Sequence, residues 1–322
     1  MFDLVQLEAA AETVHRVMPP TPQYAWPLLG LRTGAEVWVK HENHTPAGAF
    51  KVRGGIVFMD EWKKSGRHAN GFISATKGNH GQSIAFAGTR AGYPVTIVTP
   101  VGNNPETTAA MRGFGADVIE HGEDFEAARL HSIALAQERG LQNIGPFEPW
   151  LTRGVATYAL EFFRAVDGLD TVYVPVGQGS GICATIIARD LLGLETKVVG
   201  VVAEGAPCHA LSFAAGRIVT TDTVDTFADG VATRVPQELP LEIMLKGADR
   251  FVTVSDAEIA FAMRAYWLDT HNIACGAGSA PLAALLKEHD QMRGRKVGLI
   301  LSGGNIQLPL FLELMRRTQQ AA

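Results

Sequence analysis

Short apolar runs alternate with longer stretches of helical periodicity along this chain. The runs are rich in β-branched residues, and several are apolar on both faces, as buried strands of a parallel sheet are. They predict strands at residues 36–40, 71–74, 95–98, 171–174, 197–202 and 297–301. Helices are predicted at residues 52–64, 81–90, 105–114, 124–137, 155–163, 182–192, 256–269 and 308–317. This alternation predicts an α/β fold with parallel, twisted sheets flanked by helices and right-handed crossovers.

Two of the predicted strand–loop–helix units carry glycines in the loop, one after Ser74 and one after Val176. Two such units indicate two sheets and therefore two domains. We place a small inserted domain at residues 52–144 and a large domain at residues 1–51 and 145–322. A length of 322 residues suits this division.

The composition and charge of the chain restrict the kinds of partner that it is expected to bind. Hydrophobic residues make up 47% and charged residues 19% of the sequence, as in folded globular proteins. The net charge of −5, without a long basic or acidic block, predicts that neither nucleic acid nor a membrane is a partner. Acidic residues near the N-terminus argue against a secretory signal. Three separated cysteines suit reduced thiols, so a cytoplasmic location is expected.

A lysine stands between a small-residue turn and a predicted helix, in the segment Pro46–Gly55. Burial disfavours a charged amine, so Lys51 in an apolar setting would lose its proton more easily. A neutral amine forms a Schiff base with a carbonyl compound. For a lysine taken alone, a solvated surface position is the commoner alternative.

The loop Gly177–Gly181 follows an apolar strand and opens a helix. A helix N-terminus offers unpaired N–H groups and a partial positive charge, which favour a phosphate. The loop lacks the third glycine of the G-x-G-x-x-G pattern, so a mononucleotide-like phosphate such as that of pyridoxal phosphate is preferred to a dinucleotide. A tight strand–helix turn without a ligand is the alternative.

Two further segments carry polar groups at strand ends. In Thr76–Gly81 the backbone amides are suited to a carboxylate, and Asn79 offers both a donor and an acceptor. A simple helix cap is the alternative for this loop. Ser302 ends an apolar strand, where its hydroxyl suits a pyridine nitrogen that stays unprotonated, or it is only a turn serine.

In order and spacing, these four segments resemble the threonine dehydratase and serine racemase family of pyridoxal phosphate enzymes. Residues 104–116 and 227–231 also look like family segments, so the resemblance covers almost the whole chain. It implies fold type II, the fold of the tryptophan synthase β chain, with pyridoxal 5'-phosphate bound by the large domain. It also implies a homodimer that acts on a small amino acid.

The resemblance implies a role for each matching residue. Lys51 would hold the cofactor as a Schiff base, with Phe50 packed beside it. Asn79 would contact the 3-oxygen of the cofactor, and Ser302 would meet its ring nitrogen. The cofactor phosphate would be wrapped by Gly177, Gln178, Gly179, Ser180 and Gly181. The substrate carboxylate would be held by the loop of Thr76, Lys77, Gly78, Asn79 and His80.

Departures from the family pattern bear on the substrate. Ala49 replaces a serine next to the lysine, and Ala274 replaces an acidic residue. Lys77 replaces the serine that serves racemases as an acid/base, which argues against racemisation by that route. Lys77 is then a second proton carrier, an anchor for a substrate anion or a solvated cation. Glu204 lacks the second carboxylate of the family's cation site, because Ala210 stands there, so no metal is predicted.

The implied reaction is α,β-elimination from a β-hydroxy-α-amino acid, with Lys51 as the base. Such a dehydratase, or ammonia-lyase, releases a 2-oxo acid and ammonia. Threonine and serine are the family defaults, and the altered residues admit phenylserine and 3-hydroxyaspartate. A racemase or a β-replacement synthase on the same cofactor is the alternative. A non-catalytic protein that binds pyridoxal phosphate or a nucleotide is a further one.

Overall fold

The computed structural model describes residues 1–320 as two compact units, each built on its own sheet. Unit 1 comprises Met1–Pro19 and Thr45–Thr157, and unit 2 comprises Pro20–His44 and the chain from Tyr158 onward. Lys51 therefore lies in the unit that holds the smaller sheet. The domain boundaries expected at residues 51/52 and 144/145 stay a prediction.

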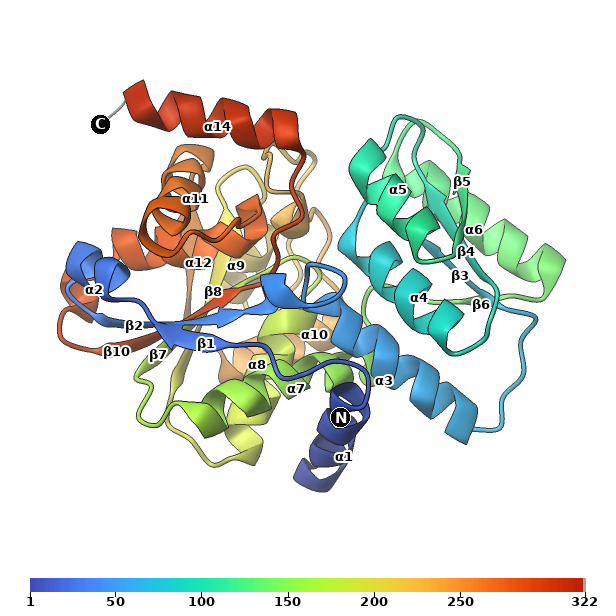
Figure 1. Cartoon of the computed structure of the whole chain (residues 1–322), viewed down its shortest axis with the longest axis horizontal. Coiled ribbons are helices and arrows are strands. Elements are labelled where there is room, and N and C mark those ends of the chain that lie inside the picture. The colour runs from blue at the N-terminus through green and yellow to red at the C-terminus, as the bar shows by residue number, and fades with distance from the viewer. Residues whose placement is uncertain (321–322) are drawn as a thin grey trace. The chain divides into compact units, whose positions relative to one another are not determined.

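The sheet of unit 2 has six strands in the order β1-β2-β10-β7-β8-β9 (Figure 1). All neighbours pair in parallel except β1, which is antiparallel to β2. The bounds are Gln23–Ala25 for β1, Glu36–His41 for β2, Lys296–Leu301 for β10, Thr171–Pro175 for β7, Lys197–Ala203 for β8 and Arg250–Val254 for β9.

Alternate residues of these strands form a buried core with α11 and α12, for example Val199 and Val201 of β8 with Ile259 and Leu282. On β10, glycine allows the ring of Phe162 in α7 to approach closely: a Cβ on Gly298 would lie 2.7 Å from it. The helices outside unit 1 are α2 (Pro27–Thr33), α8 (Ser180–Leu191), α9 (Cys208–Ala215), α10 (Glu238–Gly247), α11 (Asp256–Thr270), α12 (Gly276–Lys287), α13 (His289–Met292) and α14 (Leu308–Gln320). Helix α7 (Pro149–Ala165) begins in unit 1 and continues into unit 2.

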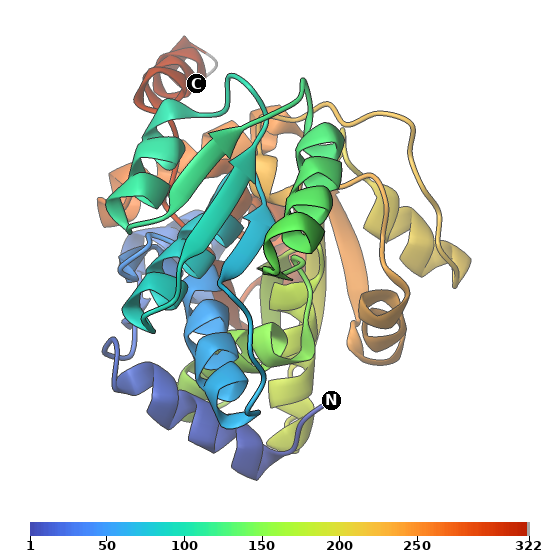
Figure 2. The ribbon, with the colours of Figure 1, turned by 90° about the vertical axis from the view of Figure 1, so that its right-hand side faces the viewer.

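Unit 1 holds a parallel sheet of four strands in the order β5-β4-β3-β6. Phe72 and Ile97 pack with α3, α4 and α5, whereas Ile73 and Val98 pack with α6 on the other face. Figure 2 shows these strands with helices on both sides. The bounds are α1 (Leu4–His15), α3 (Lys51–Lys64), β3 (Phe72–Ala75), α4 (Asn79–Arg90), β4 (Val95–Thr99), α5 (Pro105–Gly113), β5 (Asp117–Glu120), α6 (Phe125–Arg139) and β6 (Gln142–Asn143).

The predicted α/β class with parallel sheets is confirmed, and each of the six predicted strands is present with its ends within one residue. The helix expected at 155–163 begins earlier, at Pro149, because proline is well suited to the first turn of a helix. Among the residues described, no helix is both long and apolar enough to cross a membrane.

Candidate functional site

Lys51 is the first residue of α3, and its amine lies in a largely apolar setting. The side chain is half-buried, and its Nζ lies 5.2 Å from the centre of the Phe50 ring. Burial lowers the pKa of Lys51 to about 8, because the ammonium form loses hydration. The neutral amine, the form able to react with a carbonyl, is therefore much more accessible than in a solvated lysine.

Glycines allow α3 to pack closely against its neighbours in unit 1. A Cβ on Gly54 would lie 2.9 Å from the Leu151 carbonyl oxygen, and one on Gly154 would lie 2.4 Å from the Arg53 carbonyl oxygen. Both distances are shorter than real Cβ contacts, so larger residues would push the helices apart. The helix that begins with Lys51 is thus held in place by backbone packing.

The turn before Lys51 is closed by a buried hydroxyl. Thr45 Oγ1 accepts a hydrogen bond from Ala49 N at 2.9 Å and donates one to Ala49 O at 2.8 Å. Gly48 has a φ of +66°, which glycine adopts without strain. Sequence reasoning missed Thr45, because a threonine in a loop carries no sign of the backbone group that it will meet.

The loop between β3 and α4 is organised by Thr76. Its Oγ1 accepts hydrogen bonds from Gly78 N at 3.0 Å and Gly81 N at 3.4 Å. Asn79 is the first residue of α4, while the side chain of Lys77 is exposed. Thr76 therefore already occupies two of the amides in this segment, and a carboxylate here would depend on the others.

His80 is buried one residue further on. Burial and the positive charge of Lys51 lower the pKa of His80 to about 3, so its ring is neutral at physiological pH. Its Nε2 lies 3.3 Å from Ile144 O, which orients the ring. Helices α3 and α4 also touch where Gly55 lies against Ser83, so Lys51 and this loop lie in one neighbourhood of unit 1.

The glycine loop of unit 2 connects β7 to α8. Gly179 caps α8 with a φ of +92°, and no side chain caps the helix at that position. A Cβ on Gly177 would lie 2.2 Å from Gly230 O, so only glycine fits there without displacement. Ser180 is buried, and Gln178 Oε1 accepts from Gln237 Nε2 at 3.5 Å. The loop lies between a strand and a helix N-terminus, as the sequence predicts, and its binding of a phosphate stays a prediction.

Ser302 directly follows β10 and is 5% exposed. Its neighbour Gly303 accepts a hydrogen bond from Cys275 N at 3.0 Å and lies so close to Gly278 that a Cβ there would be 2.6 Å from Gly303 O. Strands β10 and β7 are adjacent and parallel, so Ser302 and the glycine loop lie at the same edge of the sheet.

Two sets of predicted residues are thus brought together, each within its own unit. Unit 1 holds Phe50, Lys51 and the loop Thr76–His80, and unit 2 holds Gly177–Gly181 and Ser302. The glycine loop suits a phosphate, the amine suits an aldehyde, and the serine hydroxyl suits an aromatic nitrogen. These donors fit the functional groups of pyridoxal phosphate.

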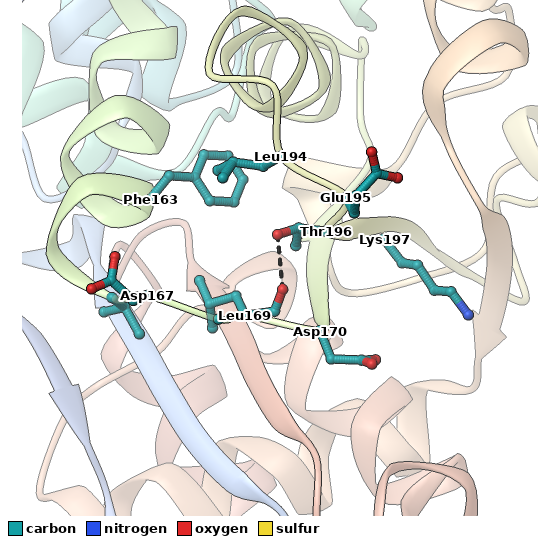
Figure 3. A pocket seen from close by; sticks show the side chains of 10 residues that line it. Phe163, Asp167, Leu169, Asp170, Leu194, Glu195, Thr196 and Lys197 are labelled. Atoms are coloured by element: carbon teal, nitrogen blue, oxygen red, sulfur yellow. Dashed lines mark hydrogen bonds between the residues drawn. The ribbon is translucent and has the colours of Figure 1, made fainter.

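A cavity of about 370 Å³ in unit 2 has a different location (Figure 3). It is lined by residues before or at the start of β7 and β8, including Phe163, Asp170 and Lys197. Beside it, Thr196 Oγ1 donates to Leu169 O at 2.8 Å. The glycine loop follows the opposite end of β7. This cavity therefore contains none of the predicted site residues.

Comparison with known proteins agrees with the chemistry of these residues. The chain is 31% identical over 321 residues to an L-threonine ammonia-lyase of Thermotoga maritima, covering 98% of this chain and 79% of that protein. It is 31% identical to an L-threo-3-hydroxyaspartate ammonia-lyase of a Pseudomonas species, covering 95% and 96% of the two chains.

A solved structure of threonine deaminase isoform 2 from Solanum lycopersicum superposes with a TM-score of 0.89 at 28% identity, covering 98% of this chain and 94% of that one. The prediction of fold type II is thereby confirmed, and with it the cofactor, pyridoxal 5'-phosphate. The family model described as pyridoxal-phosphate dependent enzyme matches residues 15–303, and the chain belongs to that family.

Proposed function

We propose that this chain is a pyridoxal phosphate-dependent dehydratase, an ammonia-lyase for a β-hydroxy-α-amino acid. The observation that carries the proposal is the half-buried Lys51, whose pKa is lowered to about 8 at the start of a tightly packed helix. The relatives named as ammonia-lyases for threonine and 3-hydroxyaspartate support this choice of reaction.

The bound cofactor supplies an electron sink that acidifies the Cα–H bond of an attached amino acid. Lys51 would hold the cofactor, and its free amine would take the Cα proton at Nζ. The glycine loop Gly177–Gly181 holds the phosphate through amides, and Ser302 keeps the ring nitrogen uncharged. With its nitrogen held uncharged by Ser302, the cofactor would supply chemistry that favours loss of the β-hydroxyl over return of the proton to Cα.

The loop Thr76–His80 holds the substrate carboxylate, and Asn79 contacts the 3-oxygen of the cofactor. The neutral ring of His80 adds no charge to this pocket. For an acidic substrate, the two candidate cations are Lys77, which is exposed, and Arg153, which is ion-paired with Glu61. Because Arg153 already has a carboxylate partner, Lys77 is the one we assign to the side-chain end of a substrate anion.

Release of ammonia and a 2-oxo acid from a small panel tests the proposal. The panel holds L-threonine, L-serine, L-threo-phenylserine and both L-3-hydroxyaspartates, with D-threonine as the control. Turnover of at least one L-member establishes the dehydratase and its side-chain class. If a protein that has bound the cofactor released ammonia from no member of the panel, the result would contradict the dehydratase and favour a racemase or a β-replacement synthase.

The proposal also covers the cofactor-binding domain, the location of the protein and its partner. We propose that unit 2 is the core of the large cofactor-binding domain, since it carries the glycine loop and Ser302. The three cysteines are free thiols, which supports a cytoplasmic location. The amino acid substrate is the partner that this site requires.

We also propose a homodimer. Helix α11 packs against both α2 and α14, and these helices expose large apolar side chains. They include Leu31, which is 81% exposed, together with Leu28, Phe261, Leu268 and Leu312. An exposed apolar surface of this kind marks an interface. Light scattering after gel filtration should give twice the chain mass, and Leu31→Asp should shift it towards the monomer; a monomeric wild type would contradict the dimer.

A further inference from the structure

Ser83 makes an unusual hydrogen bond for a serine inside a helix. Its side chain is 1% exposed, and its Oγ donates to the backbone oxygen of Lys51 at 2.6 Å. A helical serine commonly bonds a carbonyl of its own preceding turn, whereas this hydroxyl leaves α4 and reaches α3. A carbonyl oxygen has two lone pairs, so Lys51 O can accept this bond in addition to one within its helix.

The bond is possible because the two helices touch at a glycine. A Cβ on Gly55 would lie 2.5 Å from Ser83 Oγ and 2.7 Å from Ser83 O. Gly55 is one turn after Lys51 in α3, and Ser83 is one turn after Asn79 in α4. The hydroxyl therefore joins the first residue of the helix that carries Lys51 to a position one turn into the helix that begins with Asn79.

We infer that Ser83 is a positioning residue, which fixes the backbone of Lys51 relative to Asn79 and so aims the amine at its target. The inference rests on the proposed function, in which Lys51 reacts with the cofactor and Asn79 contacts it. The reaction joins Nζ to the aldehyde carbon with loss of one water. Misplacement of a reacting group by about 1 Å can cost up to about 100-fold in rate.

The test compares Ser83→Ala with Ser132→Ala. Ser132 is fully buried in unit 1, and its Oγ likewise donates to a carbonyl, Arg129 O, at 2.7 Å, but in α6. Each variant loses a hydrogen bond from a buried serine to a carbonyl, and Ser132→Ala also loses the one that Ser132 Oγ accepts from Asn143 Nδ2 at 3.2 Å, which makes it the stricter control. Alanine is the better helix former, so both variants should fold. Cofactor-free protein, prepared by hydroxylamine treatment, is mixed with pyridoxal phosphate, and the visible absorbance follows capture across pH 6–10.

We expect Ser83→Ala to capture the cofactor about tenfold more slowly at the high-pH plateau than wild type, with the midpoint unchanged near pH 8. Ser132→Ala should match wild type in capture rate, although it should lose at least as much thermal stability as Ser83→Ala. Equal capture rates in the two variants would overturn the inference. The inference would also be overturned if the midpoint of the pH dependence moved towards pH 10 in Ser83→Ala while the plateau rate stayed at the wild-type value. The hydroxyl would then act by excluding water from the lysine and not by positioning it.

Borohydride reduction followed by peptide mapping separates this inference from the proposed function. Label on Lys51 of the wild type, with slow capture in Ser83→Ala, supports both. Label on Lys51 with no effect of Ser83→Ala removes only the positioning role. Absence of label from Lys51 in the wild type would contradict the proposed function itself.

Discussion

Two loops connect a strand to a helix at candidate binding positions, and they are built in different ways. The loop Gly177–Gly181 has a left-handed glycine at the helix cap and contacts Gly230 through backbone atoms. In the loop Thr76–His80, a side chain is the organiser, because the Thr76 hydroxyl accepts from two backbone amides. One loop is shaped by the absence of side chains, and the other by the presence of one.

This difference indicates which substitutions each loop tolerates and which kind of ligand it suits. A glycine cradle leaves its amides directed outward and cannot accept an added Cβ, so it suits a ligand of fixed shape such as a phosphate. In the loop organised by Thr76, two backbone amides already donate to the threonine hydroxyl. The amides that remain suit a smaller, exchangeable group. We therefore expect damage to the first loop to affect the cofactor and damage to the second to affect the substrate.

The largest expected effect concerns the lysine that both loops are proposed to serve. Lys51→Ala should lower turnover by about 1000-fold or more, because the variant loses both the covalent attachment and the base. Lys63→Ala, which changes an exposed lysine of the same helix, is the control and should keep its turnover. Ammonia release measures both. Full turnover by Lys51→Ala would mean that neither loop serves this lysine.

The next effect concerns the glycine loop. Gly177→Ala should weaken binding of pyridoxal phosphate by at least about tenfold, since its Cβ would lie 2.2 Å from Gly230 O and overpacking costs about 1–3 kcal/mol. Fluorescence titration of cofactor-free protein gives the dissociation constant. Gly113→Ala adds the same methyl group in open space and should bind normally. Normal binding by Gly177→Ala would mean that this backbone contact does not matter.

A smaller effect is expected at the loop Thr76–His80. Thr76→Val removes the acceptor for Gly78 N and Gly81 N, so KM for the amino acid should rise about fivefold while cofactor affinity stays unchanged. Thr76→Ser keeps the hydroxyl and should restore KM. Steady-state kinetics and cofactor titration test the pair. An effect on the cofactor instead of the substrate would reverse the roles assigned to the loops.

The smallest effect is a dependence of stability on pH. The pKa of Lys51 falls from an ordinary 10.5 to about 8 on folding, so the unfolded chain holds more protons between these values and stability rises with pH there. Below pH 8 the poorly hydrated ammonium of Lys51 destabilises the fold. Cofactor-free Lys51→Met should therefore have the higher Tm at pH 7, by about 3 °C, and the gap should narrow by pH 9. A gap independent of pH would contradict the lowered pKa.

Much of the fold was accessible from sequence because the central strands are strongly apolar. Three of the elements that escaped prediction lack such a pattern. Helix α12 (Gly276–Lys287) is buried along most of its length and contains Pro281, so it has no polar face. Strand β5 begins and ends with exposed charged residues, and β6 has only two residues. Their structure follows from neighbours distant in sequence, which local periodicity does not report.

The residues of the candidate site also fall into those that the sequence could identify and those that it could not. Lys51, the glycine loop and Ser302 could be singled out because each follows a recognisable strand or turn. Ser83 and Thr45 could not, because what distinguishes them is a hydrogen bond to the backbone of a particular residue. Ser83 meets Lys51 across 32 positions of sequence. A serine in a helix interior, where its propensity is poor, is the only local sign of such a role.

Adjacent glycines at Gly54 and Gly55 have a consequence for biosynthesis. Glycine weakens an isolated helix by about 1 kcal/mol per residue, so α3 has little tendency to form before its neighbours are present. Those glycines lie against Leu151 of α7 and Ser83 of α4, and burial is what lowers the pKa of Lys51 at the start of the helix. We therefore expect a newly made chain, in which α3 has not yet packed, to offer a more ordinary amine, so that attachment of the cofactor at Lys51 follows the folding of unit 1.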